Sequence, residues 1–135
     1  MRVFLDANVL VSAFAARGLC ADLFELVLLE HDLSVGRNVL RELAKALRVK
    51  VKLPAARAAE IVDLVSSEAA RIVDEVTTID AKVDPDDALV LGEALAGQAE
   101  LFITGDAALL RLGAVGNLEI ASPRRFWEIL HAHRP

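Results

Sequence analysis

The chain has 135 residues, 55 % of them hydrophobic, with a formal net charge of −5 and one cysteine. This length suits one sizeable core, so we expect a single domain over residues 1–135. No run approaches the ~18 apolar residues that a membrane-spanning helix needs, and Asp6 interrupts any apolar leader. A lone cysteine excludes an internal disulfide, and we expect a reduced, cytoplasmic protein without a membrane segment.

Short apolar runs alternate with helical patterns along the whole chain. Strands are expected over residues 3–5, 32–35, 70–76, 100–104 and 117–121. Helices are expected over residues 9–16, 20–30, 37–48, 54–67, 85–96 and 123–131. This alternation predicts an α/β fold, a three-layer α/β/α sandwich whose central sheet is mostly parallel and covered on both faces.

Two aspartates follow predicted strands directly. Asp6 comes after the first strand, and Asp106 follows the strand LFIT by one glycine. Ligands of open α/β sheets bind beyond the carboxyl ends of the strands. We therefore expect both carboxylates at the same edge of the sheet. A purely structural role remains open for each of them, because Asp6 can cap the helix that follows and Asp106 can cap ALLRL.

The run DPDD, residues 84–87, begins the helix over 85–96. Asp84 and Pro85 fit the N-cap and first helical positions, so Asp84 is expected to be a structural cap. Asp87 directly precedes the buried apolar run ALVLGEALA and is expected to face inward. Asp86 is expected to be more solvated, and we keep it as an accessory polar residue.

The helix over 37–48 has a basic face. At ~100° per residue, four basic side chains fall within about a quarter turn, opposite the apolar residues. These are Arg37, Arg41, Lys45 and Arg48, and we predict that they contact the phosphates of a nucleic acid. Glu42 lies at the border of the two faces. It is either a solvated glutamate that pairs with Lys45 or part of a groove wall beside the basic residues.

Carboxylates that converge in a cleft repel one another, and some are driven to protonate. A hard divalent cation reverses this penalty, because Mg²⁺ or Mn²⁺ prefers carboxylate oxygens and water. Asn8 would add a neutral polar group beside Asp6. Attack of a metal-activated water on a phosphodiester requires these groups and no histidine or serine nucleophile.

Four segments in this order, FLDANVLVSA, RELAKAL, DPDDALVLGEALA and LFITGDAALL, resemble the PIN domain, and within it the toxin branch related to VapC. The resemblance covers essentially the whole chain, including the terminal SPRRFWEIL. It implies a central parallel sheet and a metal-dependent endoribonuclease that uses Mg²⁺ or Mn²⁺. It also implies a homodimer and, for a toxin, a small antitoxin protein encoded nearby.

The same resemblance implies the roles of individual residues. The acidic quartet that is both catalytic and metal-binding would be Asp6, Glu42, Asp87 and Asp106, with Asn8 and Thr104 as accessory polar groups. Many relatives have threonine after the first aspartate, where this chain has Ala7. That difference removes a hydroxyl but no metal ligand.

Two other functions compete with the ribonuclease. A haloacid-dehalogenase-like phosphatase would match LDANVLV and ITGD, but its chemistry needs a second acid two residues after the nucleophile, where this chain has Asn8. A non-catalytic PIN-like module would bind RNA or a protein without cutting. All four acids are present, so nothing in the sequence supports an inactive site.

Overall fold

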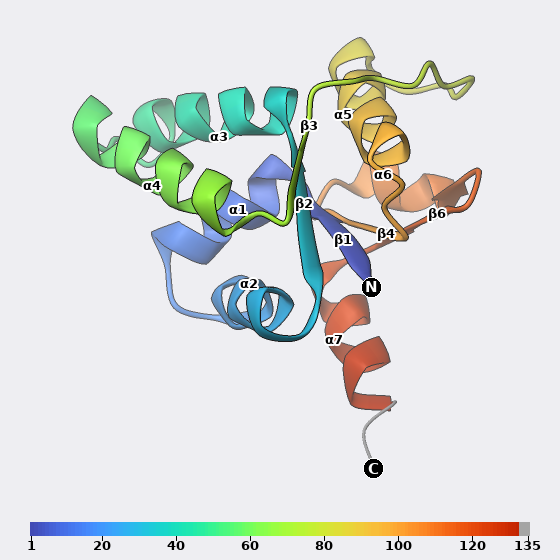
Figure 1. Cartoon of the computed structure of the whole chain (residues 1–135), viewed down its shortest axis with the longest axis horizontal. Helices are drawn as coiled ribbons and strands as arrows, with labels where there is room; N and C mark the ends of the chain where they lie inside the picture. The colour runs from blue at the N-terminus through green and yellow to red at the C-terminus, as the bar shows by residue number, and fades with distance from the viewer. Residues whose placement is uncertain (133–135) are drawn as a thin grey trace.

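The computed structural model describes residues 1–132 and shows one central sheet with helices on both faces (Figure 1). The strands are β1 (Arg2–Leu5), β2 (Asp32–Gly36), β3 (Arg71–Val73), β4 (Leu101–Ile103), β5 (Ala114–Val115) and β6 (Leu118–Ala121). Their order in the sheet is β3-β2-β1-β4-β6-β5. All neighbouring strands are parallel except β5 and β6, which confirms the predicted α/β fold.

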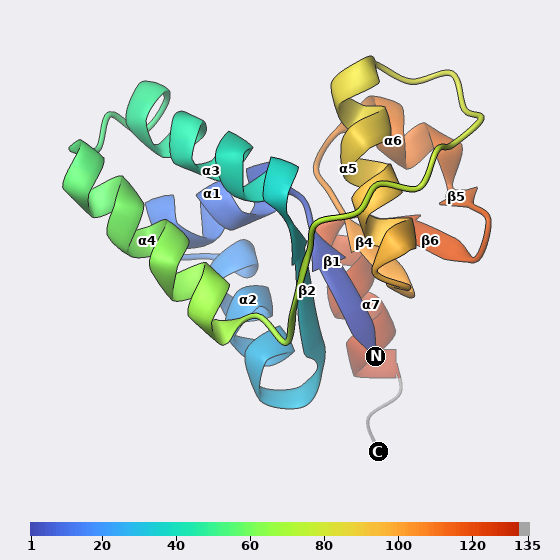
Figure 2. The same cartoon turned by 45° about the horizontal axis from the view of Figure 1, so that its top comes forward.

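The helices are α1 (Ala7–Ala15), α2 (Leu19–Glu30), α3 (Arg37–Val49), α4 (Ala55–Glu68), α5 (Pro85–Ala96), α6 (Ala107–Leu112) and α7 (Pro123–Ala132). Figures 1 and 2 show α1 to α4 on one side of the sheet and α5 and α6 on the other. Helix α7 packs against α2. None of the helices within residues 1–132 has the length and apolar character needed to cross a membrane.

The core lies between the sheet and these helix layers. Strand β1 is fully buried from Val3 to Leu5, and Phe4 stacks on Phe102 of β4 with ring centroids 5.4 Å apart. The central strands are therefore buried on both faces, as parallel strands flanked by helices must be. This rigid centre fixes the ends of β1 and β4, from which Asp6 and Asp106 emerge.

The structure differs from the sequence-based prediction at two strands. The strand expected over 70–76 is limited to Arg71–Val73, because its partner β2 ends at Gly36, which is paired with Val73. The strand expected over 117–121 is present as β6, but β5 and the short hairpin that it forms with β6 were not predicted. The two-residue turn of this hairpin contains Gly116 with φ +58°, a conformation that glycine adopts without strain.

Candidate active site

Asp6 is held at the junction of β1 and α1. Asp6 is only 6 % exposed. It is the N-cap of α1, and its Oδ1 accepts a hydrogen bond from the Ala7 backbone N–H at 2.8 Å. Its other oxygen, Oδ2, accepts the Thr104 hydroxyl at 2.8 Å and the Asn8 amide at 3.1 Å. Three hydrogen bonds therefore fix this carboxylate, and the cap role that the sequence left open is real.

Asn8 and Thr104 join the loop after β1 to the loop after β4. The Asn8 amide donates to the fully buried Thr104 hydroxyl at 3.3 Å and accepts the Gly105 N–H at 3.0 Å. The Thr104 hydroxyl also accepts the Asp106 N–H at 3.1 Å. These bonds set the position of Asp106 relative to Asp6. Two of the three residues predicted as accessory polar groups thus connect two members of the predicted quartet.

Asp106 is the N-cap of α6. Its Oδ1 accepts the Ala108 N–H at 2.8 Å and the Leu109 N–H at 3.4 Å. As with Asp6, capping and placement at the sheet edge occur together. One carboxylate oxygen of Asp106 is used by the cap, and none of residues 1–132 donates a side-chain or backbone hydrogen bond to Oδ2.

The start of α5 matches the sequence prediction. Asp84 is the N-cap and accepts the Asp86 N–H at 2.9 Å, with Pro85 in the first helical position. Asp86 is exposed, whereas Asp87 is half-buried and faces the other carboxylates. Adjacent aspartates of equal charge therefore differ in placement, and only Asp87 lines the acidic pocket.

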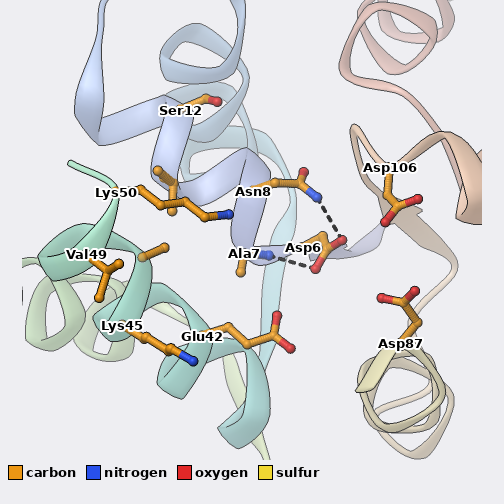
Figure 3. Close-up of a pocket in the computed structure, with 12 residues that line it drawn as sticks. Asp6, Ala7, Asn8, Ser12, Glu42, Lys45, Val49, Lys50, Asp87 and Asp106 are labelled. Carbon is orange, nitrogen blue, oxygen red and sulfur yellow. Dashed lines mark hydrogen bonds between the residues drawn. The ribbon is translucent and has the colours of Figure 1, made fainter. Parts of the chain in front are cut away.

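Side chains from four segments of the chain line this acidic pocket, which has a volume of about 530 Å³. Figure 3 shows Asp6, Asp87 and Asp106 facing one another across it, with Glu42 reaching in from α3. The carboxyl ends of β1 and β4, the first turn of α5 and the middle of α3 thus converge. All four members of the predicted quartet line one hollow.

Burial, and then the charges of neighbouring carboxylates, raise the pKa of three acids of the pocket. Burial, followed by the charges of Asp6, Asp86 and Asp87, raises the pKa of Glu42 from its ordinary 4.5 to about 7. Burial also raises the pKa of Asp6, although the bonds from Thr104 and Ala7 oppose it. The pKa of Asp87 is raised by burial first and then by Asp106. The pocket holds more negative charge than its surroundings compensate.

The donor set of the pocket suits a hard divalent cation, because it consists of carboxylate and amide oxygens without a thiol or imidazole. Within residues 1–132, however, no three acidic, histidine or cysteine side chains are gathered closely enough to form a ready-made metal site. The raised pKa values indicate uncompensated charge. A bound cation would relieve this charge, so the residues fit the ion in chemistry and would have to draw together around it.

The four predicted RNA-binding residues of α3 separate into two groups. Lys45 lines the acidic pocket and, with Arg41 and Arg48, also an adjoining groove that extends toward the start of α4. Arg37 instead forms an ion pair with Asp74, which lies after β3. Lys50, which was not among the predicted site residues, also lines the acidic pocket.

Glu93 is a buried acid that sequence reasoning missed. It lies on α5, is 0 % exposed, and its Oε2 accepts the Asn38 N–H at 2.8 Å at the first turn of α3. Helix α3 has no side-chain cap of its own, since its N-cap is Gly36. A Cβ atom at Gly36 would lie only 2.1 Å from the Glu93 carboxyl carbon. The one available signal was a glutamate inside an otherwise apolar helix.

The fold and the site together define an α/β protein with an acidic pocket at the carboxyl ends of its central strands. The family model described as PIN domain matches residues 2–108, a range that includes all four acids of the pocket. The chain therefore belongs to the PIN domain family. None of the curated proteins matches its sequence.

Two solved structures share the fold. The chain is similar to one in VapBC2 from Rickettsia felis, a complex bound to a DNA fragment from its promoter, with 18 % identity and a TM-score of 0.64. That match covers 90 % of this chain and 98 % of the other. A chain of VapBC-1 from nontypeable Haemophilus influenzae matches with 15 % identity and a TM-score of 0.66, over 92 % and 99 % of the two chains. Because both sequence identities are below 25 %, the likeness to these structures shows the fold alone.

Proposed function

We propose that the protein is a metal-dependent endoribonuclease that hydrolyses single-stranded RNA. The observation that carries this proposal is the convergence of Asp6, Glu42, Asp87 and Asp106 on one pocket, with raised pKa values for the first three. Membership of the PIN domain family supports the same chemistry, since nucleases are typical of it.

In this proposal the four acids would hold Mg²⁺ or Mn²⁺. The bound ion would supply Lewis-acid chemistry, lowering the pKa of a water and balancing charge on the phosphodiester. Thr104 and Asn8 orient the Asp6 carboxylate through the bonds to its Oδ2. Lys45 and Lys50, which line the same pocket, would attract the phosphates next to the scissile one.

A toxin role is part of the same proposal. Both structural neighbours come from VapBC complexes, so we propose that a small antitoxin encoded nearby binds this protein and that the two proteins act in the cytoplasm. A homodimer is proposed with it, in keeping with the 55 % hydrophobic content of the chain. Light scattering measures the oligomer, and co-purification with the protein of the adjacent reading frame measures the pair.

A cleavage assay with a mixed-sequence RNA oligomer tests the ribonuclease directly. The purified protein is expected to cut RNA in Mg²⁺ or Mn²⁺ and to stop in EDTA. Equal cutting in EDTA would contradict the metal mechanism. Metal-dependent release of phosphate from p-nitrophenyl phosphate without RNA cleavage would support a phosphatase. RNA binding with no turnover of either substrate would indicate a binding module.

A further inference from the structure

A second hollow, with a volume of about 280 Å³, adjoins the acidic pocket. Asn8, Ser12 and Asp106 line both hollows, so the two are continuous along α1. In the view of Figure 3, Asn8 lies between Glu42 and Ser12. The far wall of the second hollow includes Cys20, from the first turn of α2, and elements that follow the carboxyl ends of β4 and β6.

The two hollows join along α1, and the Asn8 side chain lies at the boundary between them. Its amide donates to Asp6 and Thr104, and its oxygen accepts from Gly105. These three hydrogen bonds, to the segments after β1 and β4, hold the Asn8 side chain in this position. A polymer lying across the acidic pocket would therefore meet two distinct compartments.

The two compartments differ in chemistry. The acidic pocket has three carboxylates besides Asp106, together with Lys45 and Lys50, and so suits phosphate and cation. The second hollow has one charged residue, Asp106 at the shared edge, and is otherwise lined by neutral groups. Among these are the Ser12 hydroxyl, the Cys20 thiol and the apolar ring of Pro123. Burial raises the pKa of the Cys20 thiol, which keeps it neutral.

Neutral hydrogen-bonding groups beside apolar surface recognise an uncharged heteroaromatic ring rather than a phosphate. At about 30 Å³ per water, the hollow has room for roughly nine waters, which suits one nucleoside but not two. We propose that it binds the nucleobase of the nucleotide next to the scissile phosphate and so sets the base preference of cleavage. This inference rests on the ribonuclease function proposed above.

The single cysteine of the chain makes occupancy of the hollow measurable without catalysis. In EDTA, the rate of Cys20 alkylation by N-ethylmaleimide is followed with and without a fluorescein-labelled single-stranded RNA oligomer. Fluorescence anisotropy of the same samples reports binding. At about ten times the dissociation constant, occupancy alone would slow alkylation about tenfold.

Full RNA binding with an unchanged alkylation rate would overturn the nucleobase site and leave the ribonuclease intact. Absence of both binding in EDTA and cutting in Mg²⁺ would instead contradict the proposed function on which the inference depends. The two failures are therefore distinguishable.

A second measurement uses the cleavage pattern. Cys20→Phe fills the hollow and is expected to change the preferred base at one position adjacent to the cut, as read by sequencing the RNA ends. Leu29→Phe adds a ring to the same helix at a 77 % exposed position outside both hollows, and is expected to keep the parent's preference. An unchanged preference in a folded Cys20→Phe protein would contradict the proposal. If Cys20→Phe does not fold, the alkylation measurement decides.

Discussion

Asp6 combines two roles whose energetic effects oppose each other. Its carboxylate caps α1 and accepts bonds from Thr104 and Asn8, which favour the ionised form. Burial and the nearby Asp106 disfavour that form and dominate, since the pKa is raised. Asp6→Asn would relieve charge but place an NH₂ group against one of three donors. Asp87 has no such bonds within residues 1–132, so its replacement isolates the effect of charge.

Glu42 predicts a pH dependence of stability. Its pKa rises from 4.5 to about 7 on folding, so the folded chain binds the proton more tightly than the unfolded chain does. By linkage, its stabilising contribution is complete below about pH 4.5 and is lost as the pH rises toward 7. In EDTA, the melting temperature of the parent is expected to fall between about pH 5 and pH 7.

Glu42→Gln removes the titrating group and is the matched control for this measurement. Its melting temperature in EDTA should depend less on pH over the same range. A parent protein that becomes more stable from pH 5 to pH 7, or a Glu42→Gln variant with the parent's full slope, would show that Glu42 titrates near its ordinary pKa.

At the scale of elements, a buried contact fixes α3 to α5 and so relates Glu42 to Asp87. Glu93 reaches from the middle of α5 to the first turn of α3, and only glycine at position 36 leaves room for its carboxylate. The Gly36 backbone has φ −106°, a conformation open to any residue. The need for glycine there is therefore a matter of space alone.

Gly36→Ala should consequently destabilise the protein through collision with Glu93. Glu93→Ala should cost about 0.5–2 kcal/mol, the usual loss for a helix cap, whereas Glu93→Gln keeps an acceptor oxygen and should cost less. In the double variant, Gly36→Ala should cost much less than it does alone. Urea denaturation of the parent, Gly36→Ala, Glu93→Ala and the double variant gives the coupling energy between the two positions. Purely additive losses of unfolding free energy would refute the contact.

The elements also show where sequence reasoning succeeded and where it could not. The long apolar periodicities of 37–48 and 85–96 predicted α3 and α5 closely, because burial and helix caps are encoded locally. The β5–β6 hairpin was missed, although Gly116-Asn117 is a recognised turn signal. The Glu93–Gly36 contact joins residues 57 positions apart by a fit of shapes, which one sequence does not reveal.

For the site, strand ends predicted the positions of Asp6 and Asp106, and a helix start predicted that of Asp87. Glu42, inside α3, was left open between a solvated position and a groove wall, and only the family resemblance added it to the quartet. It could not indicate that Arg37 pairs with Asp74 or that Lys50 reaches the acidic pocket. Both depend on how α3 lies against its neighbours. The roles of the four acids in catalysis and metal binding remain predictions.

At the scale of the whole molecule, the proposed ribonuclease carries a net charge of −5, and the basic groups of α3 would give it a local means to attract RNA. Arg41→Ala and Lys45→Ala should each weaken binding of a single-stranded RNA oligomer. Each should also reduce the slope of log K against log salt by about 0.7 per lost phosphate contact. Fluorescence anisotropy over a salt series measures both effects.

Arg37→Ala is the internal comparison, because its guanidinium is already engaged by Asp74. It should change the salt slope less than Arg41→Ala or Lys45→Ala does. Equal slopes for the parent and all three variants would mean that RNA does not contact this face of α3.

We propose that the chain folds as one domain, because one hydrophobic cluster includes residues from both the first and the last strands of the central sheet. Within that unit the acidic pocket is the feature on which the functional account depends. Its central claim is that acids from separate elements form one divalent-cation site.

Calorimetric titration of Mn²⁺ into the metal-free protein at pH 8 tests this claim most directly. The parent should bind the ion, and Asp87→Asn should weaken binding by about tenfold or more, or ~1.4 kcal/mol. Asp86→Asn makes the same charge change one residue away, outside the acidic pocket, and should weaken it far less. A parent that binds no Mn²⁺, or equal losses in the two variants, would contradict the account.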